Sequence, residues 1–296
     1  MMTSQKKPVG FVGLGEMGFG MARNLLEKGH DVLAFDTRDA PLQAFAELGG
    51  RRAASLAEIG SACERVMVMV VSGDQVDAVL SPQSGLLQTL SQGTVLVHAT
   101  IALSELRRVA EVGAAHGVTV IDCPVSGGAA GANNGTLTML CGGDVGAFEA
   151  NQDVLDAVSD NITHLGPLGA GMVGKLANNL ILGIGRLAIG EAFAMAKKAG
   201  LSAETLYNTM TTCTADSKQL RGLEGVILRG EYPSRTFHGL KDLTAAVDSG
   251  RTVNQAMPLA ALTREFYQLI EDKSGGLDGG SSIQATWFAA SKSPWA

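Results

Sequence analysis

A glycine-rich run near the N-terminus has the composition and spacing of a dinucleotide-binding loop. The run consists of Gly13, Leu14, Gly15, Glu16, Met17 and Gly18. It follows a predicted strand over residues 9–13 and opens a predicted helix over residues 16–28, a context that makes a Gly-x-Gly-x-x-Gly match informative. The first glycine permits a tight turn, the second lets the backbone approach a pyrophosphate, and the third lets the helix pack closely on the strand. Because N–H groups at a helix start attract phosphates, the run predicts a nicotinamide dinucleotide site.

Asp36 ends the next predicted strand, over residues 32–35. An acid at this place can accept hydrogen bonds from the ribose hydroxyls and repels a 2′-phosphate, which favours NAD over NADP as the cofactor. Arg38 lies two residues further on and could pair with a phosphate, so NADP is not excluded. An exposed aspartate that merely opens a turn is the alternative interpretation.

A second group of residues, Ser126, Gly127 and Gly128, follows a predicted strand over residues 118–121. Ligands of open α/β sheets bind beyond the carboxyl ends of the strands. A serine hydroxyl and consecutive glycine N–H groups at that place form a suitable cradle for a carboxylate. The same three residues would be ordinary in a surface turn, so composition alone leaves both interpretations open.

Lys175 and Asn179 are four residues apart in a long predicted helix over residues 172–199, so they share one helix face. A lysine on a mostly apolar helix is costly unless it is paired or functional. Desolvation and the nearby helix N-terminus disfavour its charge, and we expect a lowered pKa. A lysine whose pKa is lowered to about 7–8 can exchange a proton with an alcohol at neutral pH. Asn179 could orient the same hydroxyl. A lysine that extends its charge from the domain edge into solvent is the alternative.

The elements that must position these residues fall into two parts. The first 165 residues alternate short apolar runs with helical patterns, which predicts an α/β fold: a Rossmann-type doubly wound parallel sheet with helices on both faces. Residues 166–296 show no convincing strand pattern, so we expect an all-α domain that begins with the long interdomain helix. The remaining predicted strands cover 66–71, 95–98, 137–140 and 162–165. The remaining predicted helices cover 42–48, 74–80, 103–116, 145–158, 203–212, 219–229, 241–249 and 258–271.

Bulk composition argues against several other classes of protein. The net charge is −6 and no basic run exceeds two residues, so no nucleic-acid partner is expected. The four cysteines form no Cys-x-x-Cys pair and no His-Glu-x-x-His motif occurs, so we expect no metal site and small, buried, reduced cysteines. The start of the chain lacks the apolar segment of a signal peptide, and the longest aliphatic run has six residues, Val66 to Val71. We therefore expect a cytoplasmic protein without a membrane partner.

Four sequence blocks occur in an order that resembles a known family. They are residues 10–26, 122–143 and 169–179, followed by Lys241-Asp242-Leu243. Together they closely resemble the β-hydroxyacid dehydrogenases, which include 3-hydroxyisobutyrate dehydrogenase, tartronate semialdehyde reductase and L-threonate dehydrogenase. The resemblance spans nearly the whole chain. It implies NAD(P)-dependent oxidation of a small 3-hydroxy acid, or reduction of the corresponding semialdehyde.

The resemblance also implies roles for individual residues. Lys175 corresponds to the catalytic lysine and Asn179 to its partner. The residues implied to bind the substrate carboxylate are Ser126, Gly127 and Gly128. The residues implied to contact the cofactor, besides the glycine-rich run and Asp36, are Val70 and Val71 on the adenosine side, Thr100, and Lys241, which closes over both cofactor and substrate.

Two segments depart from the family pattern. Val71-Ser72-Gly73-Asp74 stands where many relatives have Leu-Pro, and the segment 235–240, which contains His238, looks shorter than usual. Because both segments border the substrate in the family, the substrate of any one relative is not carried over. The 6-phosphogluconate dehydrogenases are disfavoured because Leu182 stands where they place a glutamate.

Two other functions stay open at this stage. An imine reductase would share the architecture, although those enzymes usually replace the lysine at position 175 by another proton donor. The other is a non-catalytic NAD-binding module. The long apolar helix needs burial on more sides than one small domain supplies, so we expect a homodimer or homotetramer.

Overall fold

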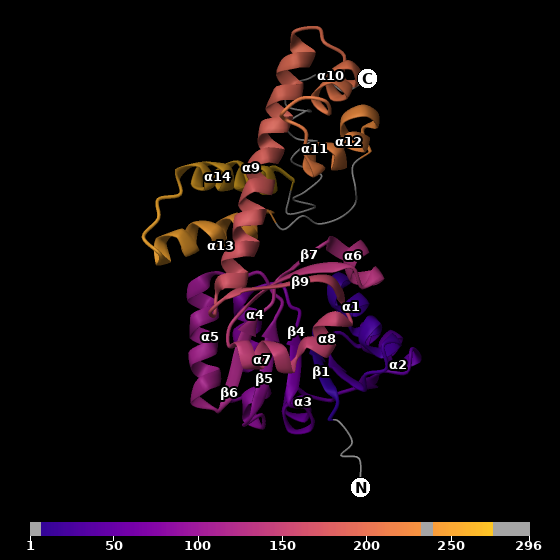
Figure 1. Ribbon diagram of the computed structural model, residues 1–296, viewed down its shortest axis with the longest axis vertical. Helices are drawn as coiled ribbons and strands as arrows, with labels where there is room; N and C mark the ends of the chain where they lie inside the picture. Colours follow the sequence, from indigo (N-terminus) through magenta and orange to yellow (C-terminus); the bar gives the residue numbers. More distant parts are fainter. Residues whose placement is uncertain (1–6, 232–238, 275–296) are drawn as a thin grey trace. The chain divides into compact units, whose positions relative to one another are not determined.

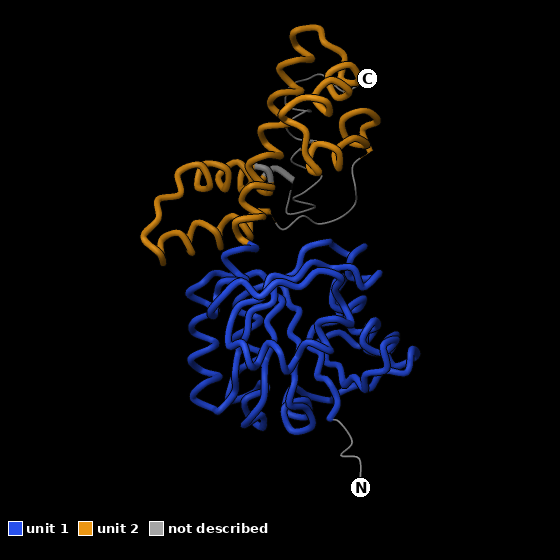
Figure 2. The backbone as a smooth tube through the Cα atoms, in the orientation of Figure 1, with its two compact units in different colours: residues 1–175 blue, residues 176–296 orange. Residues whose placement is uncertain are grey.

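The computed structural model describes residues 7–231 and 239–274. His238 and most of the segment that precedes Lys241 lie outside the described residues. The chain divides into two compact units, residues 1–175 and 176–296 (Figure 2). This division falls inside helix α9 (Ala170–Lys198), ten residues after the boundary predicted at 165/166. The two units are described separately.

Unit 1 is built on a sheet in the order β3-β2-β1-β4-β5-β6-β8-β7, with β9 paired to β8. The strands are β1 (Val9–Val12), β2 (Val32–Phe35), β3 (Arg51–Arg52), β4 (Arg65–Val68), β5 (Gly93–Val97), β6 (Val118–Asp122), β7 (Val125–Ser126), β8 (Leu137–Gly142) and β9 (Ser159–Gly166). The first six strands pair in parallel. Their order, 3-2-1-4-5-6, is that of a dinucleotide-binding Rossmann sheet.

The sheet is mixed rather than wholly parallel, which corrects the sequence-based prediction. Strand β8 runs antiparallel to both β6 and β7, with Asp122 opposite Gly142 and Val125 opposite Met139. The connection from Ser126 to Leu137 is shorter than the dozen or more residues that a parallel crossover needs, so the chain turns back on itself. Strands β8 and β9, which are separated by two helices, are parallel again.

Helices cover both sides of this sheet (Figure 1). They are α1 (Glu16–Glu27), α2 (Asp39–Glu47), α3 (Leu56–Ala62), α4 (Gly73–Leu80), the 3-10 helix η1 (Leu86–Gln88), α5 (Leu103–Ala115), α6 (Gly128–Asn134), α7 (Val145–Ala150) and α8 (Gln152–Asp156). Phe11 and Leu96 of the sheet are fully buried against Met21 and Leu25 of α1 in one core cluster. Burial of each such side chain contributes about 1.5–3 kcal/mol, which holds α1 and its preceding loop on the sheet.

Several boundaries differ from the prediction. Strand β4 ends at Val68, so Val70 and Val71 lie in the loop that follows it. The helix predicted over 145–158 is interrupted at Asn151, and β3 and α3 were not predicted. Gly29 and Gly117 end α1 and α5 with positive φ angles of 86° and 75°, as the helix-stop pattern predicted.

The described residues of unit 2 form helices joined by turns, with no strand among them. After α9 come α10 (Ala203–Met210), α11 (Lys218–Gly222), α12 (Glu224–Arg229), α13 (Gly239–Thr252) and α14 (Pro258–Ser274). Small clusters around Phe193 and Tyr267 form its cores.

Helix α9 is apolar and long enough to cross a membrane by length and composition alone. This is weak evidence for a membrane span, because core helices of soluble proteins meet the same criterion. Cys213 is exposed, so the prediction of buried cysteines holds only for the other three.

Candidate functional site

The glycine-rich run forms the turn from β1 into α1. Gly13 has a φ of +95°, and a Cβ atom there would overlap the carbonyl oxygen of Met69. A Cβ atom on Gly18 would overlap the carbonyl oxygen of Gly13, so this glycine lets α1 lie against the loop. A Cβ atom on Gly15 would meet nothing within 4 Å, and no side chain caps the helix at Gly15. The start of α1 therefore has no side-chain cap and has room beside Gly15, which fits a pyrophosphate at the helix start.

A cavity of ≈ 360 Å³ lies beside this turn. Among its lining residues are five of the predicted cofactor residues: Gly13, Gly15, Asp36, Val70 and Val71. Apolar side chains of Phe35, Leu56 and Val79 complete the walls, and Asp36 supplies the carboxylate. Cofactor pockets combine mostly apolar walls with a few placed polar groups, and this cavity fits the adenosine half of a dinucleotide.

Asp36 is held by the glycine-rich loop and by Arg38. Its Oδ2 accepts a 2.7 Å hydrogen bond from the Leu14 N–H, and the Arg38 guanidinium donates to both carboxylate oxygens, from Nε to Oδ1 at 2.9 Å and from Nη2 to Oδ2 at 3.0 Å. Burial raises the pKa of Asp36, but the hydrogen bonds from Arg38 and Leu14 outweigh burial and lower the pKa overall. Asp36 is therefore an ionised group in the wall of the cavity, with Arg38 beside it.

The remaining predicted cofactor residues of unit 1 lie at the same edge of the sheet. Glu16 and Met17 begin α1, and Leu14 is buried in the turn before it. Thr100 is half-buried and follows β5, two residues after His98. The carboxyl ends of parallel strands meet at one edge of a sheet, which explains why residues so far apart in sequence lie at the same edge.

The predicted substrate loop follows strand β7. Gly127 and Gly128 have φ angles of +134° and +61°, conformations that disfavour any side chain, and they lead into α6. Ser126 is half-buried and pairs with Thr138 of β8. Consecutive N–H groups next to a hydroxyl form a concave surface of the kind that binds anions.

Helix α6 is hydrogen-bonded to helix α1. The Asn24 side chain donates to the Ala132 carbonyl at 2.7 Å, and Arg23 donates to the Asn133 carbonyl at 2.6 Å. Gly20 allows this approach, because a Cβ atom there would lie 2.8 Å from the Ala132 carbonyl carbon. The last carbonyl groups of α6, which have no partner within the helix, thus find donors on α1.

Lys175 lies in the second turn of α9, and Asn179 lies one turn further along the same face. Lys175 is half-buried and Asn179 is buried. The Asn179 amide donates to Asp242 Oδ2 at 2.7 Å, and Lys241 Nζ donates to Asp242 Oδ1 at 2.8 Å. Asp242 therefore joins two residues that the sequence singled out separately, and sequence reasoning gave it no role although it directly follows Lys241.

The predicted site residues thus fall into two sets. Unit 1 carries the glycine-rich run, Asp36, the valines, Thr100, the substrate loop and Lys175. Unit 2 carries Asn179 and Lys241. Asp122, the last residue of β6, also contacts the start of α9 and was not assigned a role from sequence.

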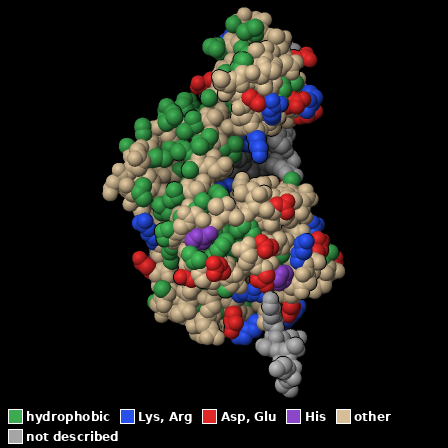
Figure 3. Space-filling model, viewed as in Figure 1, with side chains coloured by type: hydrophobic (Ala, Val, Ile, Leu, Met, Phe, Trp, Pro, Cys, Tyr) green, Lys and Arg blue, Asp and Glu red, His purple; other side chains and the backbone are tan. Residues whose placement is uncertain are grey.

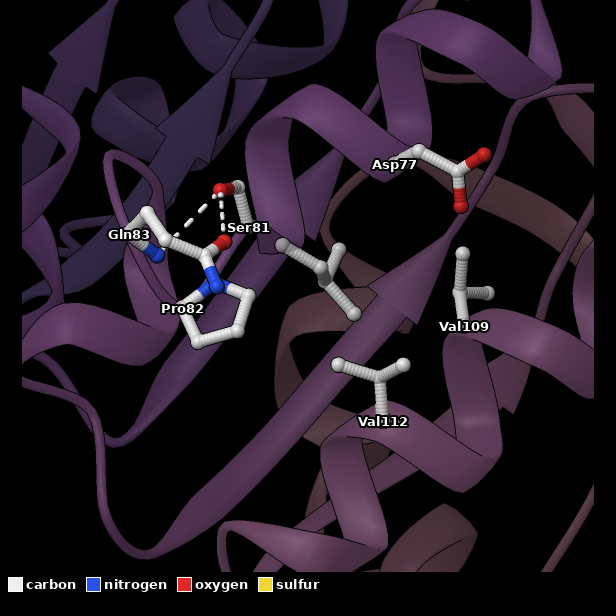
Figure 4. A pocket seen from close by; sticks show the side chains of 7 residues that line it. Asp77, Ser81, Pro82, Gln83, Val109 and Val112 are labelled. Atoms are coloured by element: carbon white, nitrogen blue, oxygen red, sulfur yellow. Dashed lines mark hydrogen bonds between the residues drawn. The ribbon is translucent and has the colours of Figure 1, made fainter.

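A second cavity, of ≈ 180 Å³, lies between α4 and α5 (Figure 4). Ser81 and Gln83 bond to each other at its edge, and Asp77 forms an ion pair with Arg108. Its polar groups are already engaged within the protein, so it carries no separate site.

Within residues 7–231 and 239–274, no group of three His, Cys, Asp or Glu side chains is arranged to hold a metal ion.

The sequence and the fold of this chain resemble those of known proteins. Residues 8–166 match the model of the NAD-binding domain of 6-phosphogluconate dehydrogenase, and residues 169–286 match the NAD-binding domain of NADP-dependent 3-hydroxyisobutyrate dehydrogenase. The chain is 35% identical over 287 residues to a probable mitochondrial 3-hydroxyisobutyrate dehydrogenase of Dictyostelium discoideum, covering 93% of this chain and 89% of the relative. It is 35% identical over 283 residues to L-threonate dehydrogenase of Cupriavidus necator, and the match covers 93% of this chain and 94% of that relative. A structure of Mycobacterium tuberculosis 3-hydroxyisobutyrate dehydrogenase with L-serine superposes on this chain with a TM-score of 0.86 at 27% identity. The superposition covers 95% of this chain and 99% of that one.

Proposed function

Because this chain belongs to the 3-hydroxyisobutyrate dehydrogenase family of β-hydroxyacid dehydrogenases, we propose that it oxidises a small 3-hydroxy acid with NAD, or reduces the corresponding semialdehyde with NADH. Members of this family are NAD(P)-dependent dehydrogenases that act on the CH–OH group of hydroxy acids. The observation that carries the proposal is that one Rossmann unit holds a cavity that fits the adenosine half of a dinucleotide, the Ser126–Gly128 loop and the helix-borne Lys175.

In the proposed mechanism each residue acts on a stated group of the substrate. Ser126 and the N–H groups of Gly127 and Gly128 bind the substrate carboxylate. Neutral Lys175 takes the hydroxyl proton at Nζ during oxidation, and protonated Lys175 returns that proton to the carbonyl oxygen during reduction. Asn179 orients the same hydroxyl. The nicotinamide, when bound, supplies the site that accepts or donates the hydride.

NAD is the proposed cofactor. Asp36 is ionised at the ribose end of the cavity, where a carboxylate accepts hydrogen bonds from ribose hydroxyls and repels a 2′-phosphate. The Arg38 guanidinium is engaged with that same carboxylate, so the positive charge that a 2′-phosphate would need is already paired.

We also propose a cytoplasmic homo-oligomer, a dimer or a tetramer. Hydrophobic side chains gather over α13 and α14 on the face shown in Figure 3. Leu259, Leu262 and Leu269 of α14 are each at least 55% exposed, and Ile181 of α9 is 72% exposed. Contiguous apolar surface of this kind supports association with another copy of the chain. A light-scattering mass close to that of one chain, 30.6 kDa, would contradict this part of the proposal.

The test combines cofactor titration with a substrate screen. NADH and NADPH are titrated by fluorescence, and then C3–C5 3-hydroxy acids, including 3-hydroxyisobutyrate, L-threonate and L-serine, are screened for a change in NADH absorbance. Lys175→Ala should lower kcat by about 10²–10⁴-fold and leave the Kd for NADH unchanged. Lys218→Ala, at an exposed position, is the matched control. Cofactor binding without turnover of any acid would support the non-catalytic module instead.

A further inference from the structure

Asp122 is a carboxylate at the end of β6 with no exposed surface. A buried carboxylate is costly unless it is hydrogen-bonded. Its Oδ1 accepts a 2.8 Å hydrogen bond from the Gly169 N–H, and its Oδ2 accepts a 2.6 Å bond from the Met172 N–H. Burial raises the pKa of Asp122, and these backbone bonds act in the opposite direction. The carboxylate is thus specifically placed by backbone donors from a distant segment.

Those donors are the N–H groups at the start of α9. The first N–H groups of a helix have no partner within it, and a serine, threonine, aspartate or asparagine just before the helix usually accepts from them. Here the preceding residue is Gly169, which has no side chain, and α9 begins at Ala170. Asp122 supplies the missing acceptor from the sheet, some fifty residues away in sequence.

Two glycines make this approach possible. A Cβ atom on Gly142 would lie 2.7 Å from Asp122 Oδ1 and 2.8 Å from the Gly171 nitrogen. A Cβ atom on Gly171 would overlap the carbonyl oxygen of Leu140 and lie 2.9 Å from Asp122 Oδ2. The first turn of α9 therefore rests directly on β8 and on Asp122, with no side chain between them.

We propose that Asp122 is a positioning residue that fixes the start of α9 and thereby sets Lys175 relative to the substrate loop. Lys175 follows Met172 by three residues, less than one helical turn. Ser126 follows Asp122 by four residues, so the loop and the lysine helix are tied to the same carboxylate. This inference rests on the proposed role of Lys175.

The test uses Asp122→Asn, which keeps the size of the side chain but turns one acceptor into a donor that faces an N–H group. Asn151→Ala is the control, since Asn151 is equally buried in unit 1 and donates to Ala147, away from α9. Hydrogen–deuterium exchange should rise about tenfold in the amides of residues 169–176 of Asp122→Asn and should not rise there in Asn151→Ala. The rate of acetylation of Lys175, measured by mass spectrometry with Lys218 as internal reference, should change only in Asp122→Asn.

The activity measurement completes the test. A small misplacement of a catalytic group costs on the order of 10²-fold in rate, so kcat of Asp122→Asn should fall by about that factor while the Kd for NADH stays unchanged. Unchanged exchange and acetylation in Asp122→Asn would overturn the positioning role. An equal loss of kcat in Asn151→Ala at equal stability would overturn it as well. If the wild-type protein turned over no hydroxy acid while exchange and acetylation changed as expected, the proposed function would fail and the positioning role would stand.

Discussion

The amide of Asn179 and the carboxylate of Asp242 form a 2.7 Å hydrogen bond between two buried side chains of unit 2. The second carboxylate oxygen accepts from Lys241 Nζ, and Asn179 Oδ1 accepts from the Asn178 amide at 3.0 Å. The hydrogen-bond network thus fixes which end of the Asn179 amide carries the oxygen. Asp242 orients one proposed site residue and pairs with another.

Removal of Asp242 should therefore destabilise the protein through Asn179. Asp242→Ala leaves a buried amide without its acceptor, which should lower the free energy of unfolding by about 1–3 kcal/mol. A double-mutant cycle with Asn179→Ala, measured by urea unfolding, should give an interaction energy of about 0.5–3 kcal/mol. Asp248→Ala is the control on the same helix, because Asp248 pairs with Arg251 at the surface. Strictly additive effects of the two substitutions would contradict the coupling.

Gly15 and Gly18 should respond differently to the same methyl group. Gly15 has an extended backbone with a φ of −71°, and a Cβ atom there would enter open space, so Gly15→Ala should leave Tm unchanged. The same methyl group would occupy the space through which the pyrophosphate approaches the backbone. Gly15→Ala should therefore weaken NADH binding by about tenfold or more. Gly18→Ala places the methyl against the Gly13 carbonyl and should lower Tm. Fluorescence titration and thermal unfolding of both variants separate the two effects. Normal NADH affinity in Gly15→Ala would place the cofactor elsewhere.

Asp36 should set the choice between the two nicotinamide cofactors. Asp36→Asn removes the charge that repels a 2′-phosphate and weakens the pairing of Arg38, so the ratio of NADPH to NADH affinity should rise about tenfold or more. Asp39→Asn, three residues away and paired with Arg52, is the control and should leave the ratio unchanged. An unchanged ratio in Asp36→Asn would show that another residue determines the preference.

His98 should make the fold sensitive to acid. It is completely buried, its Nδ1 lies 2.7 Å from the Cys123 carbonyl oxygen, and burial lowers its pKa from 6.5 to about 4. The unfolded chain takes up the proton first as the pH falls, so stability is full above about 6.5 and is lost between about 6.5 and 4. The loss should be on the order of 3 kcal/mol.

His98→Asn is the variant that tests this dependence. The asparagine amide can still donate to the Cys123 carbonyl but does not titrate, so unfolding curves at pH 7 and pH 5 should differ less than in the wild-type protein. If the variant lost stability towards pH 5 as steeply as the wild type, the acid sensitivity would come from other groups.

The parts of the fold that follow from local pattern were predictable. The strand before Gly13, the glycine that ends α1 and the helix that carries Lys175 all follow from residue spacing, because each depends on a few neighbours in sequence. The reversal at β7 and β8 was missed, since short, mostly apolar runs do not encode the direction of their partner strands. The short strand β3 depends on pairing with β2 and has no pattern of its own.

Candidate site residues could be predicted where they belong to a sequence motif, but not where their role depends on tertiary contacts. Gly13, Gly15 and Asp36, which line the cavity, were singled out because glycine spacing and an acid at a strand end are sequence signals, whereas other lining residues such as Leu56 and Gln75 carry no such signal. Asp122 and Asp242 lie inside conspicuous motifs, yet their roles depend on which distant N–H or amide reaches them after folding. Nothing in the order of residues specifies such tertiary hydrogen bonds.

The attachment of α6 to α1 has a mechanical consequence. The glycine-rich turn proposed to bind the cofactor and the loop proposed to bind the substrate carboxylate are about 110 residues apart in the chain, but Asn24, Arg23 and Gly20 hold α1 against α6. Under the proposed function, these contacts set the distance between the pyrophosphate and the substrate carboxylate before either molecule binds. A longer or shorter substrate would then have to be accommodated by the other residues of the proposed site.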